Sequence, residues 1–285
     1  MGTFSLKSIL EIEQIDDLIF RGFTPQGGTG RVYGGQVIGQ ALVAASRTVS
    51  TDRSAHSLHG YFLRAGDTDI PILYKVDRIR DGKSFTTRRV VAVQRGQAIF
   101  TMSISFQIDE EGLTHQFDMP DVPPPDALPT DEEIRQQQAK NWPEEFQDSF
   151  LGSSAIQVKP IDPVDMLNPE PAPPVQRCWM RCGEKLPDDP RIHQCVLAYL
   201  SDWSLLDTAT RPHAVSFMQD NVQVASLDHA MWFHRPFRAD EWLLYDQDSP
   251  SANGARGFNR GLIYNQAGEL VASTTQEGLV RIHPE

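Results

Sequence analysis

Three polar side chains lie on otherwise apolar faces in the second half of the chain, and their chemical types could form a reactive site. Asp202 lies at the edge of the apolar stripe of PRIHQCVLAYLSDWSLL, residues 190–206. Ser226 shares a face with two valines in NVQVASLDHAMWFH, and Gln276 is the large polar residue on one face of ELVASTTQEGLV. A carboxylate can accept a proton, while a hydroxyl and an amide can hydrogen bond to it or to a substrate. The trio is therefore the first candidate for a chemical site.

Asp202 is the member whose position most needs an explanation. On a helix, the residues three and four positions away from it are largely apolar: Ala198, Tyr199, Leu205 and Leu206. An unpaired charge in such surroundings is strongly destabilising, so the carboxylate must find donors, bind a proton or serve a function. The structural alternative is an aspartate that reaches solvent beside Ser201. Ser226 and Gln276 have structural alternatives too, as a hydroxyl bonded to its own backbone and an amide that closes a sheet edge.

The spacing of apolar residues predicts two main helices that would position these groups. The segment 190–206 carries one apolar face, made of Ile192, Cys195, Val196, Tyr199, Trp203 and Leu206. The segment GGQVIGQALVAASRTV, residues 34–49, carries another, made of Val37, Ile38, Ala41, Leu42, Ala45 and Val49. The frequent Ala and Gly of this second segment indicate that other elements pack closely around it.

Strand-like segments follow the helix at residues 34–49. They are rich in β-branched and aromatic residues, and they run over His56–Leu63, Ile72–Ile79, Phe85–Gln94 and Ile99–Ile108. Turn signals such as Asp81-Gly82 and Arg95-Gly96 separate them. A short helix near Ser5 and a strand over 15–20 come earlier. One helix followed by a run of antiparallel strands predicts an α+β fold.

The second half of the chain repeats the first. An offset of 171 residues pairs identical residues: Phe62 with Phe233, Arg64 with Arg235, Asp69 with Asp240, Leu73 with Leu244, Tyr74 with Tyr245, and Arg89 with Arg260. One inserted residue then pairs Gln94 with Gln266 and Gly96 with Gly268. We therefore predict one helix-plus-sheet unit used twice: an N-terminal unit at 1–110, a proline-rich connector at 111–174, and a C-terminal unit at 175–285 that carries the trio.

Composition and charge exclude several classes of protein. The net charge of −12 over 285 residues argues against a nucleic-acid binder. No apolar run approaches the roughly 20 residues that span a bilayer, and three cysteines without an export signal predict reduced thiols in the cytoplasm. Cys178, Cys182 and His193 lack a fourth ligand, so no metal is expected. The loop TPQGGTGRVYGG has Tyr33 where a dinucleotide fingerprint needs its third glycine.

Basic residues concentrate in one part of the first half. They are Lys75, Arg78, Arg80, Lys83, Arg88, Arg89 and Arg95, against only Asp77 and Asp81 in the same stretch. A phosphate site and a solvated strand face would both produce this pattern, and the sequence leaves the two open.

Six segments together resemble a known family. They are YGGQVIGQAL, HSLHGYFLRAGD, DGKSFTTRRV, SLDHAMWFHRPF, ARGFNRG and ASTTQEGLVR, and they are similar to the acyl-CoA thioesterase II family over nearly the whole chain. The resemblance implies a double hotdog fold, in which two long helices are each wrapped by an antiparallel sheet and the two sheets join edge to edge. It also implies hydrolysis of medium- to long-chain fatty acyl-CoA to free fatty acid and coenzyme A.

The resemblance implies residue roles as well. The catalytic aspartate of the family falls on Asp202, its glutamine on Gln276 and its hydroxyl residue on Ser226. The sequence shows neither a G-x-S-x-G elbow nor a cysteine with an evident histidine partner, so we expect water to attack the thioester directly. Gly34 and Gly35, which open the first long helix, are the candidate donors to the oxyanion.

The expected partner is acyl-CoA. Its phosphates are expected to meet basic residues, for which the candidates are Arg88, Arg89, Arg256 and Arg260. Coenzyme A is part of the substrate and a product, so no separate cofactor is expected. The resemblance further implies a homo-oligomer, a dimer or a tetramer, and neither nucleic acid nor membrane insertion is expected.

Three alternative functions or mechanisms remain open. A hotdog enoyl-CoA hydratase pairs a helix aspartate with a histidine five positions later, but here that position is Asp207. A catalytically silent acyl-CoA sensor would bind its ligand without releasing thiol. Ser226 as a covalent nucleophile would lack the intervening histidine. The histidines beside the aromatic runs are expected to be packed or hydrogen-bonded rather than catalytic: His56, His59, His229 and His234.

Overall fold

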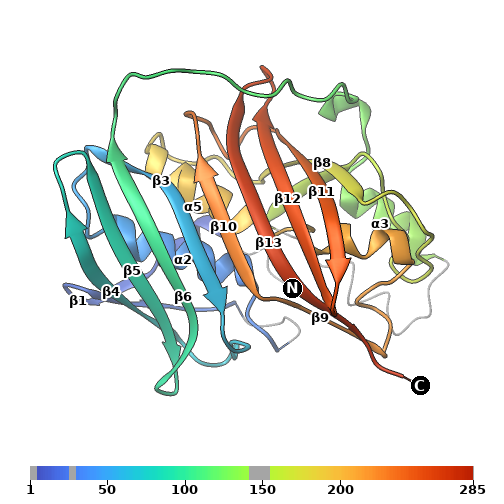
Figure 1. Cartoon of the computed structure of the whole chain (residues 1–285), viewed down its shortest axis with the longest axis horizontal. Coiled ribbons are helices and arrows are strands. Elements are labelled where there is room, and N and C mark those ends of the chain that lie inside the picture. The colour runs from blue at the N-terminus through green and yellow to red at the C-terminus, as the bar shows by residue number, and fades with distance from the viewer. Residues whose placement is uncertain (1–4, 26–29, 141–154, 285) are drawn as a thin grey trace.

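One large antiparallel sheet carries two long helices on one of its faces (Figure 1). The computed structural model describes residues 5–25, 30–140 and 155–284. Within these ranges, 13 strands form a single sheet whose paired neighbours are all antiparallel. The predicted α+β, double hotdog architecture is confirmed.

The strand order is nearly symmetric about the centre of the sheet. From one edge to the other it runs β1 (Glu13–Asp16), β2 (Ile19–Gly22), β4 (Ile72–Asp81), β5 (Phe85–Gln94), β6 (Gln97–Ile108), β3 (Arg53–Phe62), β10 (Asp228–Phe233), β13 (Leu270–Ile282), β12 (Arg256–Asn265), β11 (Leu243–Asn253), β8 (Val175–Cys182) and β7 (Ile156–Pro160). The short strand β9 (Val222–Ser226) also pairs with β13. Strands β3 and β10 meet in the middle, where His59 lies opposite Ala230.

Helices α2 (Gly34–Ser46) and α5 (Pro190–Leu200) pack against each other in opposite directions. Their close approach depends on glycine. A Cβ atom on Gly35 would lie 2.3 Å from the Tyr199 carbonyl oxygen, and one on Gly39 would lie 3.1 Å from the Cys195 carbonyl oxygen. The small residues that the sequence shows on this helix therefore serve helix-to-helix contact.

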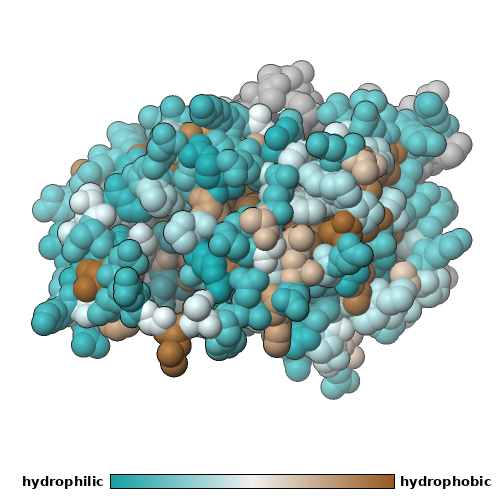
Figure 2. Space-filling view, turned by 90° about the horizontal axis from the view of Figure 1, so that it is seen from above, coloured by the Kyte–Doolittle hydropathy of each residue, from teal (hydrophilic) through white to brown (hydrophobic). Residues whose placement is uncertain are grey.

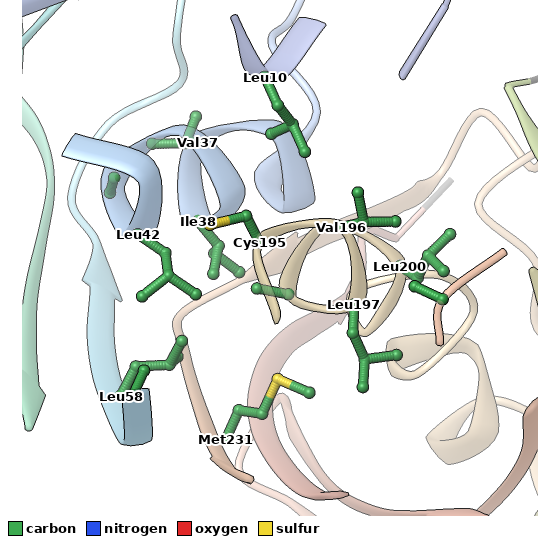
Figure 3. Packing of buried hydrophobic residues seen from close by; sticks show 14 of the residues in the cluster. Leu10, Val37, Ile38, Leu42, Leu58, Cys195, Val196, Leu197, Leu200 and Met231 are labelled. Carbon is green, nitrogen blue, oxygen red and sulfur yellow. The ribbon is translucent and has the colours of Figure 1, made fainter. Parts of the chain in front are cut away.

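The core lies between the helix pair and the concave face of the sheet (Figure 3). Ile38 and Leu42 of α2 and Leu197 of α5 are fully buried, and they pack in one cluster with Leu58 of β3 and Met231 of β10. Both halves of the chain thus contribute to a continuous core. Burial of such side chains stabilises a fold by about 1.5–3 kcal/mol each.

Shorter helices complete the described chain. Ser5 caps α1 (Leu6–Leu10), and Thr130 and Glu133 form a reciprocal capping box at α3 (Asp131–Ala139). Single turns of 3-10 helix occur at η1 (Pro125–Ala127), η2 (Leu206–Ala209) and η3 (Arg211–His213). No helix formed by the described residues has both the length and the apolar composition needed to cross a bilayer. The surface seen from above is mainly hydrophilic, with hydrophobic groups in separate spots (Figure 2).

The segment predicted as a connector crosses from the first half of the sheet to the second (Figure 1). Its strand β7 extends the sheet by pairing with β8, and the Trp179 indole donates to the Pro123 carbonyl at 2.9 Å. Residues 141–154 lie outside the described residues, as do Gly27 and Gly28 of the glycine loop. The division at 110/111 and 174/175 stays a prediction.

Two predicted elements differ most from the observed ones. The helix expected over 190–206 ends at Leu200, because Trp203 N–H donates to the Leu200 carbonyl and Ser204 adopts a left-handed φ of 58°. The strand expected over 15–20 is instead a tight hairpin of β1 and β2, whose turn is stabilised by a 2.8 Å bond from Asp17 N–H to Asp16 Oδ1. Hydrophobic spacing cannot detect these local polar contacts.

Candidate active site

The structure brings Asp202, Ser226 and Gln276 together. Gln276 Nε2 donates to Asp202 Oδ1 at 2.6 Å and to Ser226 Oγ at 3.2 Å. Asp202 follows the end of α5, Ser226 ends β9, and Gln276 lies in β13, where it is fully buried. Pairing of Ser226 with Gly278 across β9 and β13 places the hydroxyl beside the amide. Side chains separated by up to 74 residues thus form one cluster.

The N-terminus of α2 forms the opposite wall of this cluster. The Gly35 N–H donates to Asp202, and a Cβ atom on Gly34 would lie 2.7 Å from Asp202 Oδ2. The Tyr33 hydroxyl donates to the Tyr199 carbonyl at 3.2 Å and ties the start of α2 to the end of α5. The site therefore lies between the two halves of the chain, and glycine is required at position 34 for the carboxylate to approach.

The local environment holds Asp202 close to the point where it can exchange a proton. Burial raises the pKa of Asp202 to about 6, while the bonds from Gln276 and from the Gly35 N–H act in the opposite direction. Above that pH the carboxylate is mainly ionised and can accept a proton. A base whose pKa lies near the operating pH is well suited to general base catalysis.

A neutral histidine supports the amide of Gln276. His229 is buried, and burial lowers its pKa to about 4. Its Nδ1 lies 3.4 Å from Gln276 Nε2, and its Nε2 lies 2.9 Å from Ser201 Oγ. Gln276 Nε2 can only donate and carries two hydrogens, so the one not bonded to Asp202 is shared between Ser226 Oγ and His229 Nδ1. His229 Nδ1 therefore accepts, and His229 Nε2 carries the proton. Ser201 Oγ in turn donates to the Ala198 carbonyl at 3.0 Å, so the chain of hydrogen bonds runs from the site into α5.

Sequence reasoning did not identify His229 and Ser201 as parts of this site. The alternation along β10 carried a signal, since His229, Met231 and Phe233 all point toward the core. A histidine on that face needs two partners, and one of them is the Gln276 amide. Ser201 is fully buried rather than the solvent-facing neighbour that the structural alternative for Asp202 required.

A second carboxyl group, Asp207 on η2, lies close to the site. Burial, and then the charge of Asp202, raise the pKa of Asp207 to about 7. Asp207 and Trp203 line a mainly apolar cavity of about 270 Å³. Val158, Val164 and Phe217 contribute to its apolar wall, and charged side chains including Asp131 and Arg211 also line it.

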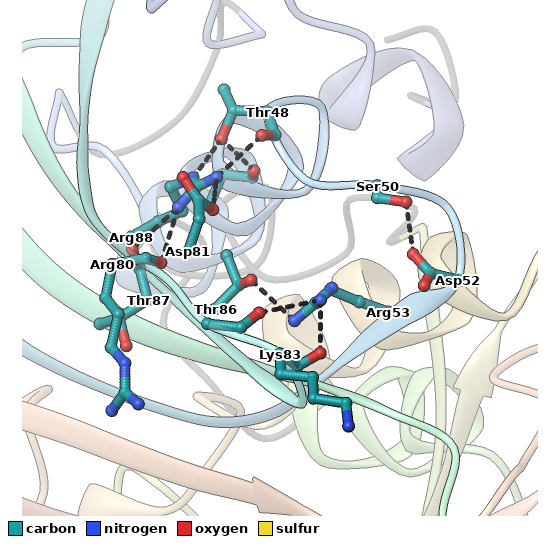
Figure 4. A network of polar contacts seen from close by, with 12 residues as sticks. Thr48, Ser50, Asp52, Arg53, Arg80, Asp81, Lys83, Thr86, Thr87 and Arg88 are labelled. Carbon is teal, nitrogen blue, oxygen red and sulfur yellow. Dashed lines mark hydrogen bonds and ion pairs between the residues drawn. The ribbon is translucent and has the colours of Figure 1, made fainter.

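The four predicted phosphate-binding arginines differ in their availability. Arg88 is only 3% exposed, and its guanidinium donates to the Thr48 hydroxyl, to the carbonyls of Thr48, Arg80 and Thr87, and to Asp81 (Figure 4). A phosphate cannot reach a side chain so enclosed, so the prediction for Arg88 is wrong. The other three are about half exposed and form ion pairs, Arg89 with Asp77, Arg256 with Glu277 and Arg260 with Asp248.

Two family models match the chain. The model described as acyl-CoA thioesterase matches residues 147–279, and the model described as acyl-CoA thioesterase N-terminal domain matches residues 23–107. Acyl-CoA thioesterase 2 of Haemophilus influenzae is 39% identical over 277 residues, covering 97% of both chains. Human acyl-coenzyme A thioesterase 8 is 41% identical over 287 residues, covering 98% of this chain and 89% of that protein.

Solved structures agree with these similarities. An acyl-CoA thioesterase II, TesB2, from Mycobacterium marinum has 47% identity and a TM-score of 0.79, with 98% of each chain covered. A conserved protein of unknown function with a hot dog fold from Alicyclobacillus acidocaldarius has a TM-score of 0.78 at 18% identity, with 99% of this chain and 100% of that chain covered. The second likeness concerns the fold alone.

Proposed function

The chain belongs to the acyl-CoA thioesterase family and is a thioester hydrolase, and we propose that it cleaves medium- to long-chain fatty acyl-CoA by direct attack of water. The observation that carries this proposal is the contact of Gln276 with both Asp202 and Ser226. The three groups converge from separate elements beside the N-terminus of α2. A base, a hydroxyl and an amide in this arrangement can hold and activate one water molecule.

In the proposed reaction, Ser226 and Gln276 hold a water molecule, and Asp202 accepts a proton from it. The resulting hydroxide oxygen bonds to the thioester carbonyl carbon, and the carbon–sulfur bond then breaks. The fatty acid leaves with the new oxygen, and the thiolate of coenzyme A takes up a proton. A positioned base contributes typically about 10² to 10⁴ in rate, and the raised pKa of Asp202 suits this role.

The oxyanion that forms on the carbonyl needs donors, and the start of α2 offers one. The first amides of a helix have no acceptor within the helix. The Gly35 N–H already donates to Asp202, so of the two predicted donors Gly34 is the one we assign to the oxyanion. The positive end of the helix dipole supports the same assignment.

The cavity beside Trp203 and Asp207 is the proposed acyl site. Its mainly apolar lining includes Trp203, the residue after Asp202, and residues between 131 and 172 of the segment that links the two halves. An apolar cavity favours a hydrocarbon chain, because burial of each methylene contributes about 0.8 kcal/mol. This supports medium- to long-chain substrates.

The coenzyme A phosphates are assigned to Arg89, Arg256 and Arg260. Each guanidinium is exposed and held by a single carboxylate. An incoming phosphate can replace such a surface partner, because exposed ion pairs contribute only about 0–1 kcal/mol.

We further propose a cytoplasmic homo-oligomer, a dimer or a tetramer. Cys178, Cys182 and Cys195 are free and buried, as expected in a reducing compartment. Oligomerisation rests on the family resemblance, and light scattering on the purified chain measures it.

Thiol release tests the proposed function. Mixing the enzyme with decanoyl-CoA and a thiol-reactive dye should release one thiol per substrate consumed. A silent sensor would instead bind decanoyl-CoA saturably with no release. Mass spectrometry of the enzyme during turnover should show the unmodified chain, whereas an acyl adduct on Ser226 would contradict direct attack by water.

A further inference from the structure

The two ends of the antiparallel helix pair α2 and α5 are structural counterparts of each other. Strands on either side of the β3–β10 junction follow the same order, and α2 and α5 cross where Gly39 meets Cys195. Aligning the helices at their first residues, Gly34 and Pro190, pairs Gly39 with Cys195 itself. An approximate two-fold axis therefore passes between the helices, and the active-site end has a counterpart at the other end.

The counterpart lacks each reactive group. The helix alignment places Ser46 where the second half has Asp202. The strand repeat places Ala55 at the position of Ser226 and Ile104 at that of Gln276. Ala55 and Ile104 are buried apolar residues, and the Ser46 hydroxyl is bonded to Cys195. This end therefore lacks the counterparts of the Asp202 carboxylate and the Gln276 amide.

A cleft nevertheless exists at this end. It has a volume of about 340 Å³ and lies where α1 covers the end of α2 and the beginning of α5. Its apolar wall is made of Leu10, Val43, Ile192, Cys195 and Val196. By the helix alignment, Val43 corresponds to Tyr199 at the active-site end. The cleft is thus the counterpart of the approach to the active site, without its chemistry.

The rim of the cleft carries an excess of positive charge. Lys7, Arg47 and Arg191 line it together with the acids Glu11 and Asp189. Asp189 caps α5 and is bonded to Arg191 at 2.8 Å. Arg47 Nη1 donates to the Ile12 carbonyl at 2.7 Å, so Lys7 and the remaining guanidinium nitrogens of Arg47 face the single acid Glu11. The chain has a net charge of −12. A local surplus of one positive charge beside an apolar wall therefore favours a ligand that has one negative charge and an apolar part.

We propose that this second cleft binds the anion of a fatty acid and does not hydrolyse thioesters. The carboxylate lies at Lys7 and Arg47, and the hydrocarbon chain lies against Val43 and Ile192. A single surplus charge matches one carboxylate better than the several phosphate charges of a coenzyme A ester. Charge-assisted hydrogen bonds from the two cations orient the ligand.

Photocrosslinking of the full-length chain tests this site. Decanoic acid with a terminal diazirine is the probe, and mass spectrometry of peptides locates its adducts. Adducts are expected in peptides that contain Val43 or Ile192. Unlabelled decanoate should compete for them, whereas decanol should compete at least about tenfold more weakly because it lacks the charge.

A double variant removes the charges that the proposal requires. Lys7→Gln with Arg47→Gln should lower these adducts at least about tenfold and leave thiol release from decanoyl-CoA unchanged. The control, Arg95→Gln with Arg281→Gln, removes two exposed charges elsewhere and should change neither readout. A second variant, Val43→Glu, should abolish the adducts by placing a negative charge in the wall.

The proposal is wrong if wild-type adducts are absent from the Val43 and Ile192 peptides, or if decanol competes as well as decanoate. It is also wrong if the double variant keeps full labelling. Hydrolysis is measured separately by thiol release, so failure of this inference leaves the proposed function standing, and the reverse also holds.

Discussion

Arg88 in the first half of the sheet and Asn259 in the second occupy corresponding positions but differ in their hydrogen bonding. The strand repeat aligns them, and both are buried. Arg88 has acceptors around its whole guanidinium, including Asp81 at 2.6 Å. Asn259, which lies opposite Gln276, leaves its Oδ1 without a partner in the described part of the chain. At this pair of positions the first half has no free donor, whereas the second keeps an acceptor with unused hydrogen-bonding capacity.

This difference separates a structural charge from a group that can exchange a proton. A permanent charge with every donor satisfied stabilises a structure but cannot exchange a proton. A partly buried acid with a raised pKa, beside an amide and a hydroxyl, can exchange a proton. Since both halves share one backbone plan, we propose that the side chains at a few corresponding positions determine which end is reactive.

The largest predicted difference between the halves concerns Gln276 and its counterpart Ile104. Gln276→Leu removes both bonds that hold Asp202 and Ser226, so kcat/KM for decanoyl-CoA should fall about 10² to 10³-fold. Ile104→Leu should leave it unchanged and alter the unfolding free energy by less than about 1.5 kcal/mol. Equal effects of the two variants on kcat/KM would contradict the comparison.

Gly34 and Gly35 allow a sharper test within the reactive end. Gly34→Ala places a Cβ 2.7 Å from Asp202 Oδ2. Because the atoms it meets, this oxygen and Cζ of Phe62 at 2.9 Å, both lie at the ends of side chains, the fold should tolerate the change while activity falls about 10²-fold. Gly35→Ala meets the Tyr199 carbonyl at 2.3 Å and should lower the unfolding free energy by about 1–3 kcal/mol. Steady-state rates and urea unfolding separate the two outcomes.

A smaller effect is expected at His229, whose counterpart is Leu58. His229→Leu introduces the residue of the silent half and removes the partners of Gln276 and Ser201. Activity should fall about tenfold, the equivalent of one hydrogen bond. Since the histidine is neutral, the pH profile should keep its midpoint, and a displaced midpoint would instead make His229 a titrating participant.

The smallest effect on activity is predicted for Arg88. Arg88→Met removes the guanidinium donor from the part-buried carbonyl contacts of Thr48, Arg80 and Thr87, which should lower the unfolding free energy by about 1–3 kcal/mol for each group that stays unsatisfied. The KM for decanoyl-CoA should not change, whereas Arg260→Gln should raise it. A raised KM for Arg88→Met would restore the predicted phosphate contact.

The sequence predicted the parts of this molecule that depend on periodicity. The predicted strand at Phe85–Gln94 has the observed bounds, and the three predicted site residues Asp202, Ser226 and Gln276 are in contact. Alternation identifies which face a residue occupies, and the family resemblance predicts which polar residues take part in the reaction.

Other parts depend on contacts between distant segments and could not be predicted from spacing. The end of α5 at Leu200 is set by local carbonyl bonds and by the φ of Ser204. The enclosure of Arg88 depends on Thr48 and Asp81, which approach it from other elements. Likewise, the raised pKa of Asp207 follows from burial beside Asp202.

The pH dependence of hydrolysis tests whether Asp202 is the base that activates water. With its pKa at about 6, Asp202 is protonated at lower pH and cannot accept a proton from water. The kcat/KM of the wild type should therefore rise with pH to a plateau, with an acidic midpoint at about 6. Asp202→Asn should lower the plateau about 10² to 10⁴-fold and abolish that limb. A folded Asp202→Asn enzyme with near-normal turnover and an unchanged pH profile would contradict the account.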